Sequence, residues 1–211
     1  MIVLINPNST ISMTEAMLRT ARETAPSAHF EGWTSHGGPP AIQGAADGLL
    51  AEDPLLRLVT KASEQGASAI IIGCFDDTAL DAARQIAKCP VIGIGQAAYH
   101  LAAVAGGRFS VVTTLDVSVP ILEANISTYG LSRKLGKVRA SRVPVLSLDL
   151  DPETAVKKVI AEVERAARED GVHSVVLGCG GMVDVGQRMG RVGSVRLIDG
   201  VRAAAAMASQ L

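Results

Sequence analysis

The chain has 211 residues, of which 48% are hydrophobic and 19% charged, and its formal net charge is −1. This length and composition allow one large domain or two small lobes around a substantial core. The near-neutral charge and an aromatic content of only 3% disfavour nucleic acid as a partner. No run approaches the roughly 18 apolar residues of a membrane span, so no membrane partner is expected. Three cysteines, and a start without the basic segment of a signal peptide, predict a cytoplasmic protein with free thiols.

Short β-branched runs alternate with amphipathic helical segments along the whole chain. This order predicts an α/β fold with parallel sheets, because parallel strands are buried on both faces and are therefore continuously apolar. The predicted strands are Ile2–Ile5, Ala69–Ile72, Val91–Ile94, Phe109–Thr113, Val175–Leu177 and Val195–Ile198, with weaker candidates at Ala28–Trp33 and Val138–Val143.

Three of the intervening helices carry recognisable start signals. In "STISMTEAMLRTARETA", Ser12 and Glu15 have the spacing of a capping box. In "EDPLLRLVTKASEQG", the helix is predicted to begin at Pro54, because proline is favoured at the first helical position. The same pattern recurs in "DPETAVKKVIAEVERAAREDG", where Asp151 is the predicted N-cap and Pro152 the first residue.

The two halves of the chain resemble each other. "IVLIN" opens the first half at Ile2, "FSVVT" opens the second at Phe109, and each half contains an apolar run that ends in Gly-Cys. The pattern predicts two pseudo-symmetric lobes, each a mainly four-stranded parallel sheet flanked by helices. Residues 1–95 would form the first lobe and 96–198 the second, with 199–211 packing back on the first. Ligands bind at the carboxyl ends of such strands, so the active site is expected in the cleft between the lobes.

Cys74 and Cys179 lie 105 residues apart, and each comes just after a predicted strand and before a predicted helix. The helix predicted after Cys179 lies within "GGMVDVGQRM". A single buried cysteine is often only a small core residue. A helix N-terminus, however, lowers the pKa of a nearby thiol from about 8.5, and two such thiols could face one ligand. A disulfide, a metal site or a redox pair is also conceivable, but no CxxC pattern or closely spaced histidine pair accompanies them. Two-sided proton transfer fits best: a thiolate takes a proton from one face of a carbon acid, and a thiol returns one on the other face, without cofactor or metal.

Polar residues at the ends of other strands are candidates for substrate contacts. Asn6 and Asn8 in "INPNST" offer amide donors and acceptors, although a turn that leads into a helix N-cap explains them equally well. Thr113 and Thr114 in "VVTTLD" could bind a polar ligand or start a helix. The glycine-rich turn after Cys179 and the helix N-terminus after Cys74 would supply N–H donors to an enolate oxygen.

Asp76 and Asp77 follow directly after the first Gly-Cys pair. We predict that at least one of them caps the next helix, "DDTALDAARQIAK"; an aspartate close to a thiol would also raise its pKa. The Gly/Pro-rich loop over residues 35–44 could cover the cleft. Cys89 has no counterpart at the repeat spacing and is expected to be structural.

Eight motifs spread over nearly the whole chain resemble the hydantoin racemase branch of the aspartate/glutamate racemase superfamily, which includes allantoin racemases. They are "LINPNST", "GPPAIQG", "GCFDDTALDAAR", "PVIGIGQAA", "GGRFSVVTT", "PILEANISTYGL", "LGCGGM" and "IDGV". The resemblance implies a homo-oligomeric enzyme in which Cys74 and Cys179 act as the acid/base pair and no cofactor takes part. It also implies a set of residues that line the substrate: Asn6, Phe75, Thr113, Thr114 and Gly180.

The sequence therefore predicts a cofactor-independent racemase of a cyclic ureide, either a 5-substituted hydantoin or allantoin. An amino-acid racemase is the first alternative, but it would want a cation for the substrate α-carboxylate, and no arginine lies in a cleft motif. A non-catalytic, two-lobed small-molecule-binding protein is the second alternative, and it would have no need of two thiols. Related decarboxylases keep only one of the two cysteines, so the pair argues against that reaction.

Overall fold

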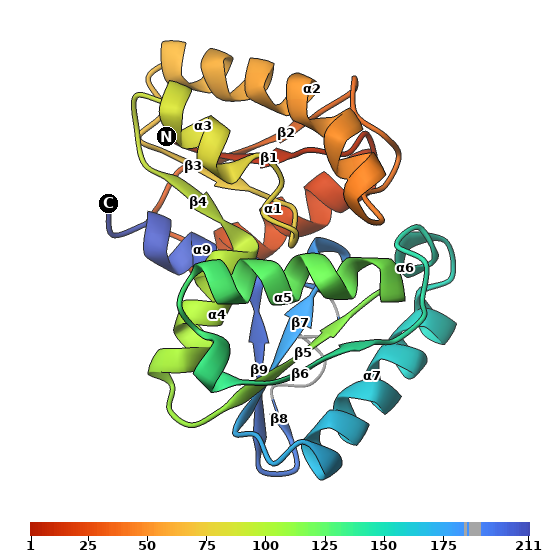
Figure 1. Ribbon diagram of the computed structural model, residues 1–211. Coiled ribbons are helices and arrows are strands. Elements are labelled where there is room, and N and C mark those ends of the chain that lie inside the picture. The colour runs from red at the N-terminus through yellow and green to blue at the C-terminus, as the bar shows by residue number, and fades with distance from the viewer. Residues whose placement is uncertain (184, 186–190) are drawn as a thin grey trace.

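The computed structural model describes residues 1–183, 185 and 191–211, and Figure 1 shows two α/β lobes stacked on each other. The strands are β1 (Ile2–Asn6), β2 (Phe30–Thr34), β3 (Ala69–Ile72), β4 (Val91–Gly93), β5 (Phe109–Thr113), β6 (Leu135–Ala140), β7 (Ser174–Gly178), β8 (Arg191–Val192) and β9 (Val195–Asp199). The α-helices are α1 (Ile11–Thr24), α2 (Ala45–Glu64), α3 (Leu80–Ile86), α4 (Ile94–Val104), α5 (Val119–Thr128), α6 (Ser147–Leu150), α7 (Pro152–Glu169) and α9 (Gly200–Ala208). Short 3₁₀ turns are η1 (Asp116–Ser118), η2 (Ser132–Lys134) and η3 (Gly180–Met182).

The first lobe is a four-stranded parallel sheet in the order β2-β1-β3-β4. Its central strands β1 and β3 are buried at every position, which explains their continuously apolar sequences. Successive side chains point to opposite faces of the sheet. Val3 and Ile5 therefore join the core beneath α2, whereas Ile2 and Leu4 join the core that α1, α4 and α9 share.

The second lobe repeats this topology. Its sheet has the order β6-β5-β7-β9-β8, in which the first four strands are parallel and only β8 is antiparallel. Val112 and Leu177 pack with α7, while Val111 and Val176 point to the opposite face, toward α4 and α5. Strands β3 and β7 occupy equivalent central positions, so the predicted α/β fold of two pseudo-symmetric lobes is confirmed.

Helices α4 and α9 join the lobes. Helix α4 follows the first sheet in the chain but contacts β7 and β9, whereas α9 follows the second sheet and contacts α1, β3 and β4. The two helices also pack on each other, and a side chain at Gly200 would lie only 2.6 Å from the carbonyl oxygen of Ile94. This close crossing gives the lobes one continuous core, which fixes the strand ends of one lobe relative to the other.

Two predicted helix starts were wrong. Helix α2 begins at Ala45 and contains Pro54 in its interior, because Asp47 accepts a hydrogen bond from the Gln43 N–H and secures an earlier first turn. In α1 no side chain of residues 1–183, 185 or 191–211 caps the N-terminus, since the Ser12 hydroxyl donates instead to Asp149, 2.9 Å away. The predicted cap of α7 is confirmed: Asp151 accepts a hydrogen bond from the Thr154 N–H at 3.4 Å.

In the described part of the chain, no helix combines the length and the apolar character needed to cross a membrane.

Candidate active site

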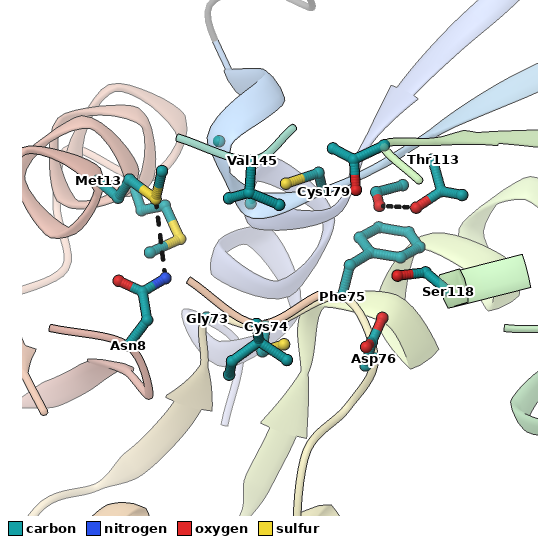
Figure 2. A pocket seen from close by; sticks show the side chains of 16 residues that line it. Asn8, Met13, Gly73, Cys74, Phe75, Asp76, Thr113, Ser118, Val145 and Cys179 are labelled. Atoms are coloured by element: carbon teal, nitrogen blue, oxygen red, sulfur yellow. Dashed lines mark hydrogen bonds between the residues drawn. The ribbon is translucent and has the colours of Figure 1, made fainter. Parts of the chain in front are cut away.

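A cavity lies where the carboxyl ends of β1 and β3 meet those of β5 and β7. Figure 2 shows its walls, with Cys74 and Cys179 on facing sides. The lining residues come from both lobes: Asn8, Met13, Met17, Ile42, Gly73, Cys74, Phe75, Asp76, Thr113, Thr114, Ser118, Val145, Gly178, Cys179, Gly180 and Gly181. The expectation of a cleft at the strand ends thus matches the position of this cavity.

Cys74 is a buried free thiol two residues beyond the end of β3. The Thr78 hydroxyl donates a hydrogen bond to its Sγ at 3.3 Å, which favours the thiolate. Burial nevertheless raises the pKa of Cys74 well above its ordinary range, and the negative charge of Asp76 raises it further. The thiol is therefore protonated at neutral pH.

Cys179 is a partly buried free thiol at the end of β7, and it forms the N-cap of η3. The backbone N–H of Gly181 donates a hydrogen bond to it, which lowers its pKa, but burial dominates and raises that pKa to about 12. The predicted lowering of both thiol pKa values by helix N-termini was thus wrong, since burial outweighs the local donors. Helix α3 begins only at Leu80, well beyond Cys74. The helix expected after Cys179 falls partly on residues 184 and 186–190, outside the described residues.

The two lobes approach each other closely beside the thiols. A side chain at Gly180 would lie 2.9 Å from the Sδ of Met17 and 3.1 Å from the carbonyl oxygen of Gly73. Glycine fits best at this position, because a Cβ atom would require the Met17 side chain to move and the Gly73 backbone to shift. Close approach at Gly73 and Gly180 therefore holds the two strand ends that carry the thiols near each other.

The other residues expected at the substrate are distributed unevenly. Phe75, Thr113 and Thr114 line the cavity, but the Thr113 hydroxyl donates to the Gly178 carbonyl at 2.9 Å and so ties β5 to β7. Asn6 is buried behind the wall. Its amide donates to the oxygen atoms of Asn8, Thr10 and Thr14, so it organises the turn rather than the cavity surface.

Asn8 takes the place at the cavity that was expected for Asn6. Its Oδ1 accepts hydrogen bonds from the Asn6 amide and the Thr10 N–H, both at 2.9 Å. Among the described residues, its Nδ2 has only the Met13 sulfur, 3.7 Å away, as a partner. Because a thioether is a weak acceptor, this amide can turn its N–H to a ligand oxygen at little cost.

Asp77 and Asp76 are adjacent but have opposite surroundings. Asp77 accepts hydrogen bonds from the backbone N–H groups of Gly95 (3.0 Å) and Gln96 (2.7 Å) and from the hydroxyl of Tyr129 (2.9 Å). It therefore caps a helix, as predicted for one of the pair, but the helix is α4 and not α3. Asp76 lines the cavity, and its Oδ2 is buried without a hydrogen-bond partner in the described structure. Burial raises the pKa of Asp76 to about 6 and that of Asp77 to about 7.

Within residues 1–183, 185 and 191–211, no group of three or more His, Cys, Asp or Glu side chains is placed to hold a metal ion. Cys89 is a free thiol that does not line the cavity.

The Asp/Glu/hydantoin racemase family matches residues 2–208 of the chain. The chain belongs to this family. It is 44% identical to a hydantoin racemase of Rhizobium meliloti over 209 residues, which cover 99% of this chain and 87% of that protein. It is also 32% identical to a hydantoin racemase of a Pseudomonas species over 201 residues, covering 95% of this chain and 81% of the relative. This racemase is an isomerase, as these relatives indicate.

Solved structures of the family support the same assignment. The allantoin racemase of Klebsiella pneumoniae superimposes with a TM-score of 0.96 at 38% identity, over 100% of this chain and 86% of that one. The allantoin racemase of Pseudomonas fluorescens gives a TM-score of 0.90 at 33% identity, over 100% of this chain and 89% of that one. A glutamate racemase of Bacillus anthracis, only 14% identical, shares the fold with a TM-score of 0.74 over 99% of this chain and 80% of that one.

Several cavity residues of this racemase were missed from the sequence. The side chains of Met13, Ile42 and Val145 form apolar parts of the cavity wall, and Ser118 contributes a hydroxyl group. Hydrophobic periodicity would assign the apolar residues to the core, and nothing local distinguishes a core side chain from a wall side chain. Asp76 carried a usable signal, since a second carboxylate after a single capping position needs another role.

Proposed function

We propose that this racemase interconverts the enantiomers of a cyclic ureide, a 5-substituted hydantoin or allantoin, by proton transfer between Cys74 and Cys179. The observation that carries the proposal is that two free thiols from equivalent strand ends line one cavity from facing sides. Each thiol would lie on one face of a flat ring held between them. A single buried thiol would need no such counterpart.

The chemistry is general acid–base catalysis at a carbon acid. The C5–H bond of the ureide ring is acidic because the adjacent carbonyl accepts the electron pair as an enolate. One thiolate removes the C5 proton, and the opposite thiol then delivers its own proton to the other face of C5. The ring leaves as the mirror-image centre, and the thiol and thiolate have exchanged roles, ready for the opposite enantiomer.

The negative charge on the enolate oxygen needs a hydrogen-bond donor. Asn8 is the best-placed side-chain candidate, because the part of the chain that the structure describes offers its Nδ2 only the weak Met13 acceptor at 3.7 Å. A donor that is already positioned in the wall stabilises the developing charge without reorganisation. Raised thiol pKa values also suit this step, since a thiolate of high pKa is a strong base toward a weak carbon acid.

A neutral ureide fits the cavity better than a free amino acid does. None of the described residues that line it is lysine, arginine or histidine, so an α-carboxylate would meet no cation there. It would instead meet the carboxyl group of Asp76. The names of the relatives, hydantoin racemase and allantoin racemase, agree with a ureide substrate.

We further propose that the reaction needs no cofactor and that the enzyme is a cytoplasmic homo-oligomer. All three cysteines are free, as expected in a reducing compartment. Leu49, Leu50 and Leu150 are 73%, 65% and 80% exposed and offer apolar surface for subunit contacts. A purely monomeric mass in light scattering would contradict the assembly.

Incubation of the purified protein with optically pure hydantoins and with allantoin tests the activity. Loss of optical rotation, followed by chiral chromatography, is the expected result, and prolonged dialysis against a chelator should leave the rate unchanged. If no ureide racemises above its spontaneous rate, the proposed function fails. If chelation abolishes turnover and added metal restores it, the two-thiol mechanism fails.

A further inference from the structure

The side chain of Asp76 forms part of the cavity wall, and the described residues leave one of its oxygen atoms without a hydrogen-bond partner. The loop that carries it is held through its backbone, because the Asn125 amide donates to the Asp76 carbonyl oxygen at 2.8 Å. The carboxyl group itself lines the cavity, and its Oδ2 is buried without a partner in the described residues. Figure 2 shows it at one end of the cavity, with Asn8 at the other.

Such a group weakens the fold unless it serves a ligand. Burial of a carboxylate without hydrogen-bond donors is unfavourable. Burial raises the pKa of Asp76 to about 6, so that the carboxylate form prevails above about pH 6. The adjacent Asp77 shows what a structural carboxyl group looks like here, with three donors around it. An unpartnered acceptor aimed into a cavity points to a ligand that brings the donor.

Asp76 also lies within electrostatic reach of both thiols. Its charge raises the pKa of Cys74 and of Cys179, which lie on facing sides of the cavity. A ring held between the two sulfur atoms would therefore present its edge to this carboxylate. The edge of a ureide ring carries N–H groups as well as carbonyl groups.

We propose that Asp76 is a specificity-determining residue whose carboxylate accepts a hydrogen bond from a ring N–H of the cyclic ureide. This inference rests on the proposed function. The charge-assisted bond would select an N–H donor and hold C5 between the thiols. The same carboxylate would repel the α-carboxylate of an amino acid, so one residue would separate ureides from the amino-acid substrates.

The test compares a 5-alkylhydantoin with its N1-methyl and N3-methyl analogues at pH 8. In the wild type, methylation of the contacted nitrogen should lower kcat/KM by at least ~100-fold, because a site built for an N–H rejects an analogue that lacks it. In Asp76→Leu that ratio should fall below ~10-fold, since the variant has no buried acceptor left to satisfy. Asp81→Asn is the matched control, because its side chain is 87% exposed on α3, and it should keep the wild-type ratio.

A second variant covers the case in which Asp76→Leu does not fold. Asp76→Asn keeps the shape and removes the charge, so alkylation of Cys74 and Cys179 by iodoacetamide should shift to lower pH. An unchanged alkylation profile, or a wild type that accepts all three hydantoins equally, would overturn the inference. Calorimetric measurement of hydantoin binding distinguishes failure of this inference about Asp76 from failure of the proposed function. Asp76-dependent binding without racemisation would overturn only the function, whereas absence of binding would overturn both.

Discussion

The part of the cavity wall around Cys74 (the Cys74 wall) and the part around Cys179 (the Cys179 wall) occupy equivalent places in their lobes but differ in structure. Each thiol follows the central strand of a parallel sheet, β3 in one lobe and β7 in the other. Around Cys74 the chain forms an irregular loop before α3, and the side chain of Thr78 donates to the sulfur. Around Cys179 the chain turns at once into η3, and the backbone of Gly181 is the donor.

This difference shows that the two halves of the chain share the position of the thiol but not the hydrogen-bond donor to it. A racemase must act on both enantiomers, yet two thiols with different donors need not be equally basic. For a hydantoin whose only stereocentre is C5, the enantiomers have equal free energy, so kcat/KM must be the same in both directions. A difference in basicity between the two thiols would therefore appear in the rates of isotope exchange but not in a comparison of kcat/KM for the two enantiomers.

Removal of either sulfur should have the largest effect. Cys74→Ser and Cys179→Ser should each lower the racemisation rate by about 10³-fold or more, because a serine hydroxyl is a far poorer acid and base than a thiol, and such catalysis contributes about 10²–10⁴-fold. Chiral chromatography of the product measures the loss. Cys89→Ser, whose thiol lies away from the cavity, is the control and should retain wild-type activity. Full activity in either of the first two variants would remove that cysteine from the mechanism.

The pH dependence of kcat/KM tests the property that the two walls share, a thiol whose pKa is raised by burial. Burial raises the pKa of both thiols, that of Cys179 to about 12, so both are protonated at neutral pH and the active thiolate gains population as the pH rises. We expect kcat/KM to increase by about tenfold per pH unit, or about 100-fold between about pH 6.5 and 8.5, after subtraction of spontaneous racemisation. A profile that is flat over this range would contradict the raised thiol pKa values, because kcat/KM reports ionisations of the free enzyme.

The attachment of the Cys74 wall to the other lobe should matter for stability. Asp77→Ala leaves three donors on α4 and Tyr129 unsatisfied and should lower the free energy of unfolding by about 2 kcal/mol. Burial raises the pKa of Asp77 to about 7, so its contribution is fully present at low pH and is lost as the pH rises through 7. Urea unfolding should therefore show a larger difference at pH 5 than at pH 8. Asp81→Ala, which changes an exposed carboxylate, serves as the control, and an equal loss in both variants would contradict this role.

The donor to Cys74 should give the smallest effect. Thr78→Val removes the hydrogen bond that lowers the pKa of Cys74 and should reduce kcat/KM by about tenfold, since a hydrogen bond to a charged group is worth about 1.5–3 kcal/mol. Deuterium exchange should slow mainly for the enantiomer that Cys74 deprotonates. Thr60→Val, which removes a hydroxyl bonded to its own helix, should change nothing. Equal slowing of exchange for both enantiomers would place Thr78 outside the Cys74 wall.

Much of the fold could be predicted because its determinants are local. Strands β1, β3, β5 and β7 are short, continuously apolar runs, since they are buried on both faces. The start of α2 could not be predicted, because Pro54 in its interior imitates the first residue of a helix. The two-residue strand β8 is too short to leave a pattern.

The candidate site, too, could be predicted only where its determinants are local. The position of each cysteine at a strand end could be predicted from the Gly-Cys pairs, whereas the thiol pKa values depend on burial by distant segments. Asp77 was expected at its own helix but caps α4, which a local pattern cannot reveal. Asn6 and Asn8 differ by two positions, and only the turn geometry decides that Asn8 lines the cavity.

Deuterium exchange with each pure enantiomer of a 5-substituted hydantoin tests most directly whether each wall serves one enantiomer. After correction for spontaneous exchange, Cys74→Ser should exchange the C5 proton of only one enantiomer with retention of configuration. Cys179→Ser should do so for only the opposite enantiomer, as followed by NMR. Exchange of both enantiomers in either variant, accompanied by racemisation, would contradict the assignment of one thiol to each face.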